Sequence, residues 1–384
     1  MRRPVAISLF TGTGGLDLGL SAAGYNIRLQ IDMDKECCET LRRNKQRYWQ
    51  SSTIIEDKIE NWKTLKLLEA AGLKEGEAAL VFGGPPCQPF SKSAFWSPRR
   101  WADRNRRRPS SNRSRSVESF RGLDDPRAGL LREFVRVVQD VKPTAYLIEN
   151  VFGLAYKTSR PMLDALRRSL KQAGYSFNAE VLNAADYGIP QKRERLFIIG
   201  ARDRIELFFP EPTHCDKSGA NERLCSHKPY VTAGQAIGDL DDGKVEPEEE
   251  VRGKWGNLLP LMPPGGNYLS FTKKMGYPRP IFKWRSKYWS FLLKLSPNKP
   301  SWTIQAQPGP HVGPFHWANR RLRISEIKRL QTFPDDYEIY GDRRSAQRQL
   351  GDAVPPLLAQ RLGEAMKMQL SQDQTARPAL RRDL

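Results

Sequence analysis

Over the first 200 residues, short apolar runs alternate with segments of helical periodicity, and this pattern limits the folds that the chain can adopt. Apolar runs typical of buried strands occur at 5–10 (VAISLF), 26–31 (NIRLQI), 78–82 (AALVF), 145–150 (AYLIEN) and 195–201 (RLFIIGA). Segments with helical periodicity lie between them, at 14–24, 35–44, 130–141 and 161–174. Right-handed crossovers bring the carboxyl ends of parallel strands to one edge of a sheet. We therefore predict an α/β, Rossmann-like doubly wound sheet with its ligand site at that edge.

The composition changes after about residue 201. Residues 202–320 are rich in Pro, Gly, Trp and Tyr, and they lack the helix–strand alternation. Helical segments follow at 323–333 and 356–370. We predict a catalytic domain over 1–201, completed by about 334–371. The chain would then have a smaller, irregular, β-rich domain over 202–333 and a flexible tail over 372–384.

The net charge indicates a polyanionic partner such as nucleic acid. Lys and Arg number 63 against 43 Asp and Glu, which gives +20 and a pI near 9.8. Ten basic and two acidic residues fall within residues 92–123, an Arg-, Ser- and Pro-rich segment that cannot build a core. We expect a mobile loop there, either an ordinary insertion or a lid over a site next to Cys87, and its position favours the lid.

Five cysteines at irregular spacings argue against a disulfide framework and favour a reducing compartment. No apolar stretch approaches the length that spans a membrane, so we predict a cytoplasmic protein. The segment HCDKSGANERLCSH contains His214, Cys215, Cys225 and His227, but this spacing departs from that of zinc fingers. We therefore predict no bound metal.

A glycine-rich turn follows the first apolar run, in FTGTGGLDLG. Gly12, Gly14 and Gly15 would let the backbone approach a ligand, and the following helix would offer free N–H groups. Asp32 ends the next strand, where a carboxylate can accept hydrogen bonds from a ribose. The spacing is neither a dinucleotide fingerprint nor a phosphate-binding loop. It favours a nucleoside cofactor without a phosphate clamp, of which S-adenosylmethionine is the common one.

Cys87 lies in a rigid bend, LVFGGPPCQPFS, directly after a predicted strand. Inert cysteines normally lie within apolar periodic segments, whereas this one follows glycines and prolines and precedes a strongly cationic segment. Such surroundings stabilise a thiolate. The sequence therefore favours a nucleophile over a structural cysteine.

Polar side chains at two other strand ends belong to the same predicted edge. Glu149 and Asn150 follow three apolar residues, and burial could keep the carboxyl group partly protonated. A capping role for Glu149 is equally consistent. Gln191, Arg193 and Arg195 alternate, so they share one face of an extended segment. The two arginines could form a structural ion-pair set, or hold a substrate and Glu149 in place.

Seven segments occur in the order and rough spacing found in DNA (cytosine-5)-methyltransferases, namely FTGTGG, GGPPCQPFS, DDPRAGLLREF, ENV, QKRER, RISEIKRLQTFPDDY and GDAVPP. The chain resembles that family from residue 5 to about 365. The resemblance implies that Cys87 adds as a thiolate to cytosine C6 and that Glu149 protonates N3. It also implies that Arg195 contacts the base, with Arg193 in support, and that the cytosine is flipped out of duplex DNA.

The resemblance also assigns binding residues. For the cofactor these are Phe10, Gly12, Gly14 and Gly15 at the methionine moiety, Asp32 at the ribose, Met33 and Asp57 near the adenine, and Pro86. For DNA they are Gln88, Ser91, Asn150, Gln191 and Thr303, with the segment 303–322 either in a groove or simply packed. Two positions depart from the family pattern. Ser8 replaces an aspartate and Asp352 replaces an asparagine, and both changes are expected to weaken cofactor binding.

These observations favour a monomeric, S-adenosylmethionine-dependent enzyme that methylates double-stranded DNA. By family habit we expect it to be the protecting partner of a restriction endonuclease in a bacterium. An RNA methyltransferase of the same family is the nearer alternative. A catalytically silent DNA-binding protein is the more distant one, because such a protein would be expected to lack Cys87 or Glu149.

Overall fold

The structure is a computed structural model that describes residues 3–86, 128–156, 159–217 and 225–380. The predicted residues Cys87, Gln88 and Ser91 and the segment 92–123 lie outside these ranges. Among the described residues, no helix is both long and apolar enough to cross a membrane.

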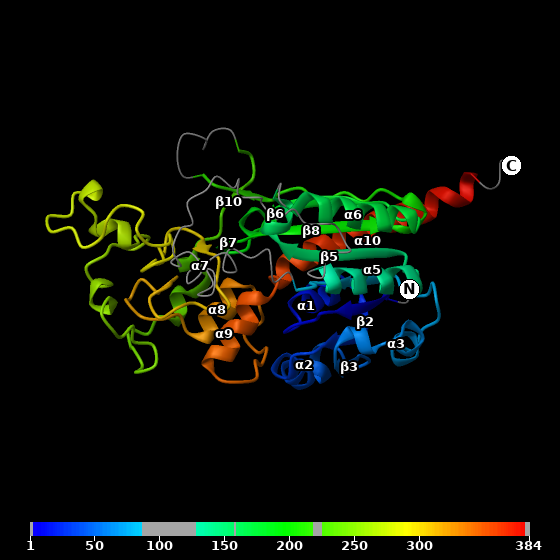
Figure 1. The fold of residues 1–384 in the computed structure, drawn as a ribbon, viewed down its shortest axis with the longest axis horizontal. Helices are drawn as coiled ribbons and strands as arrows, with labels where there is room; N and C mark the ends of the chain where they lie inside the picture. Colours follow the sequence, from blue (N-terminus) through cyan, green and yellow to red (C-terminus); the bar gives the residue numbers. More distant parts are fainter. Residues whose placement is uncertain (1–2, 87–127, 157–158, 218–224, 381–384) are drawn as a thin grey trace, which may run out of the picture.

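A seven-stranded sheet lies at the centre of the region formed by residues 1–201 (Figure 1). Its strand order is β3-β2-β1-β4-β5-β8-β6. Its strands are β1 (Val5–Leu9), β2 (Asn26–Asp32), β3 (Thr53–Glu56), β4 (Leu80–Gly83), β5 (Ala145–Val151), β6 (Asn178–Asn183) and β8 (Glu194–Ala201). The order reverses at β1, which pairs with both β2 and β4. The doubly wound sheet is therefore confirmed, with its switch point beside the glycine-rich turn.

One strand departs from the parallel arrangement that we predicted. β8 runs antiparallel to both β5 and β6, while the β1–β5 strands pair in parallel. A hydrophobic run alone does not encode direction, because a strand buried on both faces has the same apolar composition either way.

Two helical layers cover the sheet. One apolar core contains side chains of α1 (Gly15–Ala22), α2 (Lys35–Tyr48) and α10 (Pro356–Leu380), and the other contains side chains of α3 (Thr64–Ala71), α5 (Gly129–Val141) and α6 (Arg160–Gln172). Alternate strand residues serve opposite layers: Leu80 and Phe82 pack in the first core and Val81 in the second. α10 packs along α1, so the end of the chain completes the layer that its beginning starts.

The region after residue 201 is irregular, but it is not β-rich as predicted. Its described strands are the two-residue β9 (His214–Cys215), β10 (Lys228–Pro229) and β11 (Ser301–Trp302), and most of the remainder is turns and single bridges. β11 pairs with β7 (Gln191–Lys192), which joins this region to the sheet domain. α7 (Ala233–Ile237), α8 (Ile324–Leu330) and α9 (Arg343–Asp352) lie beside it.

Two further predictions are corrected here. α10 continues to Leu380, so residues 372–380 are helical where we expected a flexible tail. Cys215 and Cys225 form a disulfide, whereas the cysteine count had argued against disulfides. Since a disulfide sulfur is no longer a thiolate, this pair does not offer the ligands that a zinc site would need.

Candidate active site

The glycine-rich turn is held closed by the carboxylate of Asp32. The Gly12 N–H donates to Oδ2 at 2.7 Å and the Asp34 N–H donates to Oδ1 at 2.8 Å. Gly12 (φ 56°) and Gly14 (φ 80°) adopt the left-handed conformation, and Phe10 does so too at φ 53°. Burial raises the pKa of Asp32, while these backbone N–H groups lower it. Asp32, at the end of β2, therefore fixes the conformation of the glycine-rich turn and lies at its open side.

The space beside Gly12 is open. A Cβ placed there would meet nothing within 4 Å, whereas one on Gly14 would approach Trp49 to 2.8 Å. Met33, next to Asp32, is 62% exposed. A backbone cradle with free space, bordered by an acid and an exposed apolar side chain, has the chemistry that a nucleoside cofactor requires.

Asp57 reaches the same edge, but its carboxylate caps a local turn. It accepts hydrogen bonds from Asn61 Nδ2 at 2.7 Å and Trp62 Nε1 at 2.9 Å. Its backbone N–H donates to the Asp32 carbonyl oxygen at 3.0 Å, which places it beside the second strand. These hydrogen bonds lower the pKa of Asp57, so it is ionised at neutral pH.

The late part of the chain closes over the start of α1. A Cβ on Gly15 would lie 2.2 Å from the Val354 carbonyl oxygen and 3.3 Å from the Ala353 Cβ. The Tyr337 hydroxyl donates to the Thr13 carbonyl at 2.8 Å. Gly15 is therefore required for close backbone packing, and the glycine-rich turn and the α9–α10 turn form one unit.

A buried polar cluster below the turn was not anticipated. Ser8 Oγ donates to Asp17 Oδ2 at 3.1 Å, and Gln30 Nε2 donates to Asp17 Oδ1 at 2.9 Å. Thr11 Oγ1 donates to Ser8 Oγ at 3.0 Å. Burial raises the pKa of Asp17 to about 7, although both hydrogen bonds oppose the rise. The carboxylate beside Ser8 thus comes from α1, and an acid inside the apolar first turn of a helix was the sequence signal for it.

Glu149 and Arg195 meet at the carboxyl end of β5. Arg195 Nε lies 3.2 Å from Glu149 Oε1, and both side chains are largely buried. Burial raises the pKa of Glu149, Arg195 and Arg193 lower it, and Asp352 raises it further. The structure therefore gives Glu149 a partner in this site, in place of the capping role that the sequence had left open.

The bend that leads to Cys87 is placed against this acid. A Cβ on Gly84 would lie 2.9 Å from Glu149 Oε2, and Asn150 Nδ2 donates to the Pro85 carbonyl at 3.2 Å. Asn150 is buried, so the structure gives it a role in holding the bend. Pro86 is the last described residue of the bend and is exposed.

Arg193 is fully buried and ties the site to the late segment. Its Nη2 donates to the Gly351 carbonyl at 2.8 Å, and its Nη1 donates to the Ile304 carbonyl at 3.3 Å. Its Nε has no hydrogen-bond partner among the described residues. Arg193 therefore supports the site from behind, through backbone groups that lie far away in sequence.

The predicted DNA contact by Gln191 is not supported. Gln191 is fully buried, its Nε2 donates to Gln331 Oε1 at 2.9 Å, and its Oε1 accepts from the Ile304 N–H at 2.9 Å. Thr303, in the same ladder, is partly buried and its Oγ1 donates to the Lys192 carbonyl at 2.8 Å. Both side chains hold β7 and the segment after β11 together.

Asp352 is the last residue of α9 and lies between the glycine-rich turn and the site of Glu149 and Arg195. Its carbonyl oxygen accepts from Arg193 Nη2 at 3.4 Å, and the next two residues pack on Gly15. Its side chain is exposed and forms no ion pair within 4 Å with the described part of the chain. This carboxylate replaces a neutral amide in the family pattern, so it adds a negative charge near Glu149.

A family model of C-5 cytosine-specific DNA methylases matches residues 5–368. The chain belongs to this family. This methylase is 42% identical to the Type II methyltransferase M.SacI of Streptomyces achromogenes, over 95% of its own chain and 93% of the relative. It is 30% identical to the Type II methyltransferase M1.HphI of Haemophilus parahaemolyticus, over 94% and 86% of the two chains.

Solved structures share the fold of this methylase. A prophage-encoded DNA modification methyltransferase of E. coli superposes with a TM-score of 0.62 at 21% identity, over 96% of the methylase and 99% of that chain. The Entamoeba histolytica methyltransferase EhMeth superposes with a TM-score of 0.59 at 15% identity, over the same shares. The methylase is thus an enzyme of DNA cytosine-5 methylation with an S-adenosylmethionine-type α/β fold.

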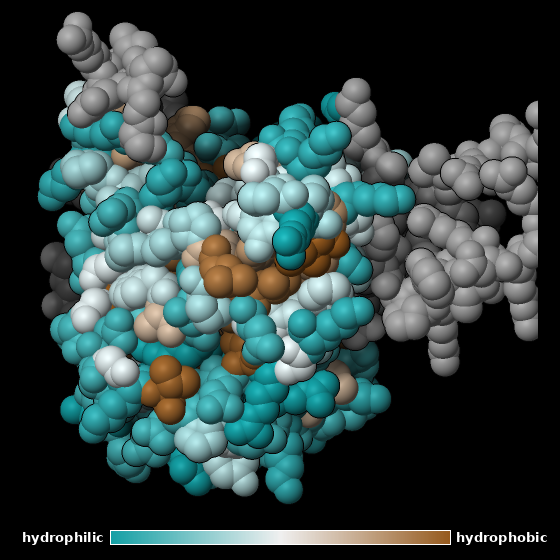
Figure 2. Space-filling model, turned by 90° about the vertical axis from the view of Figure 1, so that its left-hand side faces the viewer, coloured by the Kyte–Doolittle hydropathy of each residue, from teal (hydrophilic) through white to brown (hydrophobic). Residues whose placement is uncertain are grey.

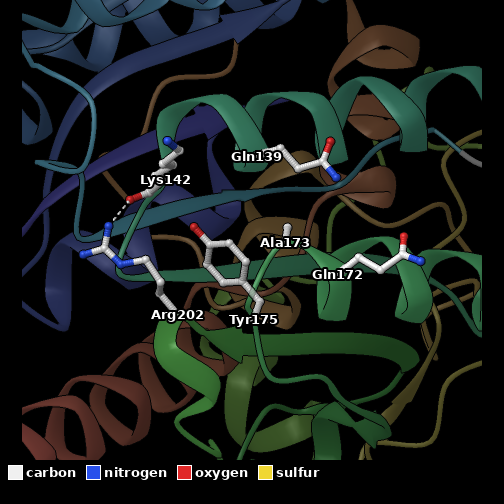
Figure 3. Close-up of a pocket in the computed structure, with 6 residues that line it drawn as sticks. All are labelled: Gln139, Lys142, Gln172, Ala173, Tyr175 and Arg202. Carbon is white, nitrogen blue, oxygen red and sulfur yellow. Dashed lines mark hydrogen bonds between the residues drawn. The ribbon is translucent and has the colours of Figure 1, made fainter.

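A cavity of about 360 Å³ lies away from this site (Figure 3). It is lined by the carboxyl ends of α5 and α6, including Lys142 and Gln172, and by Tyr175 and Arg202. Arg202 Nη1 donates to the Lys142 carbonyl at 3.0 Å. These residues lie at the edge where β5 begins, so the cavity is unrelated to the site at the other edge.

Proposed function

We propose that this methylase transfers a methyl group to C5 of a flipped cytosine in a specific sequence of double-stranded DNA, through a covalent bond between Cys87 and C6. The observation that carries the proposal is the buried Glu149–Arg195 pair at 3.2 Å, against which the bend before Cys87 is packed. A carboxyl group whose pKa is raised by burial can hold the proton that N3 of cytosine must receive.

In the proposed reaction, Cys87 and Glu149 act first. The Cys87 thiolate adds to C6 while Glu149 donates its proton to N3, which leaves C5 nucleophilic. C5 can then take the methyl group that S-adenosylmethionine, when bound, would supply. A base removes the C5 proton, the C6–sulfur bond breaks to release the Cys87 thiolate, the C5–C6 double bond is restored, and N3 returns its proton to Glu149. Arg195 orients Glu149 throughout, and Arg193 fixes the backbone that surrounds them.

S-adenosylmethionine, when bound, supplies the methyl group as a sulfonium. The residues that would hold it are Phe10, Gly12, Gly14, Gly15, Asp32, Met33, Asp57 and Pro86. The open space at Gly12, bordered by the Asp32 carboxylate, supports this assignment.

The two relatives described above are named Type II methyltransferases, which supports a role beside a restriction endonuclease whose cutting the methylation would prevent. The region 202–333 would select the DNA sequence, and 1–201 with 334–371 would carry out the chemistry as a monomer. Flipping is required because C6 of a stacked cytosine cannot be reached by a side chain.

Trapping with 5-fluorocytosine tests this function, because fluorine at C5 prevents the release of the thiolate. Genomic DNA fragments that contain the analogue are incubated with S-adenosylmethionine and either wild-type protein or Cys87→Ala. We expect a covalent adduct that maps to Cys87 and is absent from the variant, and the trapped fragments give the recognised sequence. An adduct with fluorinated RNA but not with DNA would transfer the activity to RNA. No adduct with either would leave only a DNA-binding protein.

A further inference from the structure

A long acid-free segment follows the acidic run of the second region. From Val251 to Ser325 the chain contains no aspartate or glutamate, but it contains thirteen lysines and arginines. Acidic residues flank it on both sides, at Glu250 and Glu326. A stretch of one sign over 75 residues is a strong local field rather than an ordinary mixed surface.

This segment is built on an aromatic core of its own. Tyr268, Phe271, Phe282 and Phe291 are buried together, and Trp255 packs against them. The ring centroids of Trp255 and Phe282 lie 5.0 Å apart, and those of Tyr268 and Phe282 lie 5.7 Å apart, edge to face. The core fixes the backbone, so the side chains outside it are presented from a folded support.

Exposed basic side chains that have no acidic partner among the described residues cover that support. Six lie between residues 273 and 287, namely Lys273, Lys274, Arg279, Lys283, Arg285 and Lys287. None of the six forms an ion pair with a described residue. Two arginines at the end of the segment are paired: Arg320 with Glu326 at 2.7 Å and Arg323 with Glu249 at 2.7 Å. These two arginines therefore have acids beside them, whereas the six have none among the described residues.

Aromatic rings are exposed among these cations. Trp284 is 38% exposed, and Lys274 Nζ lies 4.4 Å from its ring centroid. Trp289 and Trp302 are also exposed, and their rings meet edge to face at 5.7 Å. Large exposed rings interleaved with cations are typical of surfaces that bind nucleic acid rather than of a merely solvated face.

The surface lies on the side of the molecule that the active site faces. Trp302 pairs in register with Lys192, the residue before Arg193. Figure 1 places residues 250–290 beyond the carboxyl edge of the sheet, and Figure 2 shows that end, where a hydrophobic patch lies among hydrophilic side chains. One molecule as long as a DNA duplex can therefore reach both the surface and the active site.

The segment 303–322, which the sequence offered as a groove contact or a packed loop, is largely packed. Phe315, His316 and Arg320 are buried, and Trp317 Nε1 donates to Asp241 Oδ2 at 3.1 Å. The exposed rings and cations lie earlier in the chain, between residues 273 and 302.

We propose that the exposed face of residues 273–302 is the principal DNA-backbone contact of this methylase, with the six cations on phosphates and Trp284 and Trp289 against sugars or bases. This assignment rests on the proposed function, and it names which part of the second region meets the duplex. Phosphates neutralise the mutual repulsion of the six cations, and bound counterions leave the DNA.

The charge test uses the full-length protein with Lys274→Gln, Lys283→Gln and Lys287→Gln combined. Binding to fluorescein-labelled duplexes of random sequence is measured by anisotropy over a range of salt concentrations. We expect the affinity at low salt to fall roughly 10-fold or more, and the slope of log K against log salt to decrease by about 2 to 3. The matched control combines Lys63→Gln, Lys74→Gln and Lys171→Gln, which are exposed on outer helices or loops and should change neither quantity.

A second variant separates rings from charges. Trp284→Leu with Trp289→Leu should weaken binding about 3- to 10-fold and leave the salt slope unchanged, because stacking releases no counterions. Melting temperatures close to that of the wild type show that both variants are folded. Wild-type binding and slope in the lysine variant would overturn the assignment. A wild-type protein that adds no methyl group to DNA would contradict the proposed function instead, so the two failures are distinguishable.

Discussion

Arg195 and Glu149 form an ion pair on the diagonal between two antiparallel strands, with Nε 3.2 Å from Oε1. In the β5–β8 ladder Glu149 is opposite Phe197 and Arg195 is opposite Val151, so the two side chains reach along the strands toward each other. Because the strands fix both backbones, the geometry depends little on loop motion. A carboxyl group held this way is aligned before any substrate binds.

Glu149→Gln tests the acid. The amide is nearly isosteric but cannot donate the proton to N3, so we expect methyl transfer to fall by about 10²- to 10⁴-fold. Incorporation of labelled methyl groups into DNA measures the rate, and anisotropy measures DNA binding, which should change little. Transfer at the wild-type rate would remove Glu149 from the mechanism.

Asp352→Asn tests the extra charge. The negative charge of Asp352 contributes to raising the pKa of Glu149, so its removal lowers that pKa and deprotonates Glu149 at a lower pH. The fall of kcat/KM with rising pH should therefore begin at lower pH in the variant. Glu60→Gln, an exposed acid on an outer turn, is the control. Identical profiles for all three proteins would show that Asp352 does not influence Glu149.

Asp17→Asn tests the buried carboxyl group through stability. The pKa of Asp17 is about 7 in the folded protein against an ordinary 3.8, so the unfolded chain releases the proton first. This group therefore makes the free energy of unfolding decrease as pH rises from about 4 to about 7. The asparagine variant has no such titration. Its free energy of unfolding, relative to that of the wild type, should therefore rise by roughly 2–4 kcal/mol between pH 4 and pH 8. Thermal unfolding at both pH values measures it, and a constant difference would refute the assignment.

Gly12→Ala and Gly15→Ala form a matched pair. At Gly12 the added methyl group enters open space, so the free energy of unfolding should fall only by the strain of about 1 kcal/mol that φ 56° imposes. The methyl group would occupy the space proposed for the cofactor, so S-adenosylmethionine binding should weaken at least 10-fold. At Gly15 the methyl group would lie 2.2 Å from the Val354 carbonyl, so stability itself should fall by several kcal/mol. Calorimetric titration and thermal melting separate the two effects. Unchanged cofactor affinity in Gly12→Ala would place the cofactor elsewhere.

Arg193→Met tests the support behind the site. The variant removes hydrogen bonds to the Gly351 and Ile304 carbonyls and leaves those buried acceptors unsatisfied, so we expect a loss of about 3 kcal/mol or more. Denaturant unfolding measures it. Lys192→Met, one residue earlier and partly exposed, should change the stability by less than about 1 kcal/mol.

Prediction from the sequence succeeded where a pattern was local and strong. β1, β2, β4 and β5 lie within about two residues of the apolar runs that predicted them. β3 and β6 were missed because the first is four residues long and the second is an edge strand with polar side chains, and α9 was missed because it has few apolar residues. In each case the tertiary partner stabilises an element that its own periodicity does not specify.

A few consecutive residues were enough to predict the doubly wound fold, the glycine-rich turn with Asp32, and the placement of Glu149 at a strand end. Contacts between distant segments set the direction of β8, the burial of Gln191, the Ser8–Asp17 contact and the hydrogen bond from Arg193 to Gly351. Those last two residues are separated by 158 positions, and chain folding alone sets which groups meet across such a distance. Local residue types identify the candidate site, and packing between distant segments decides which side chains line the site and which support it.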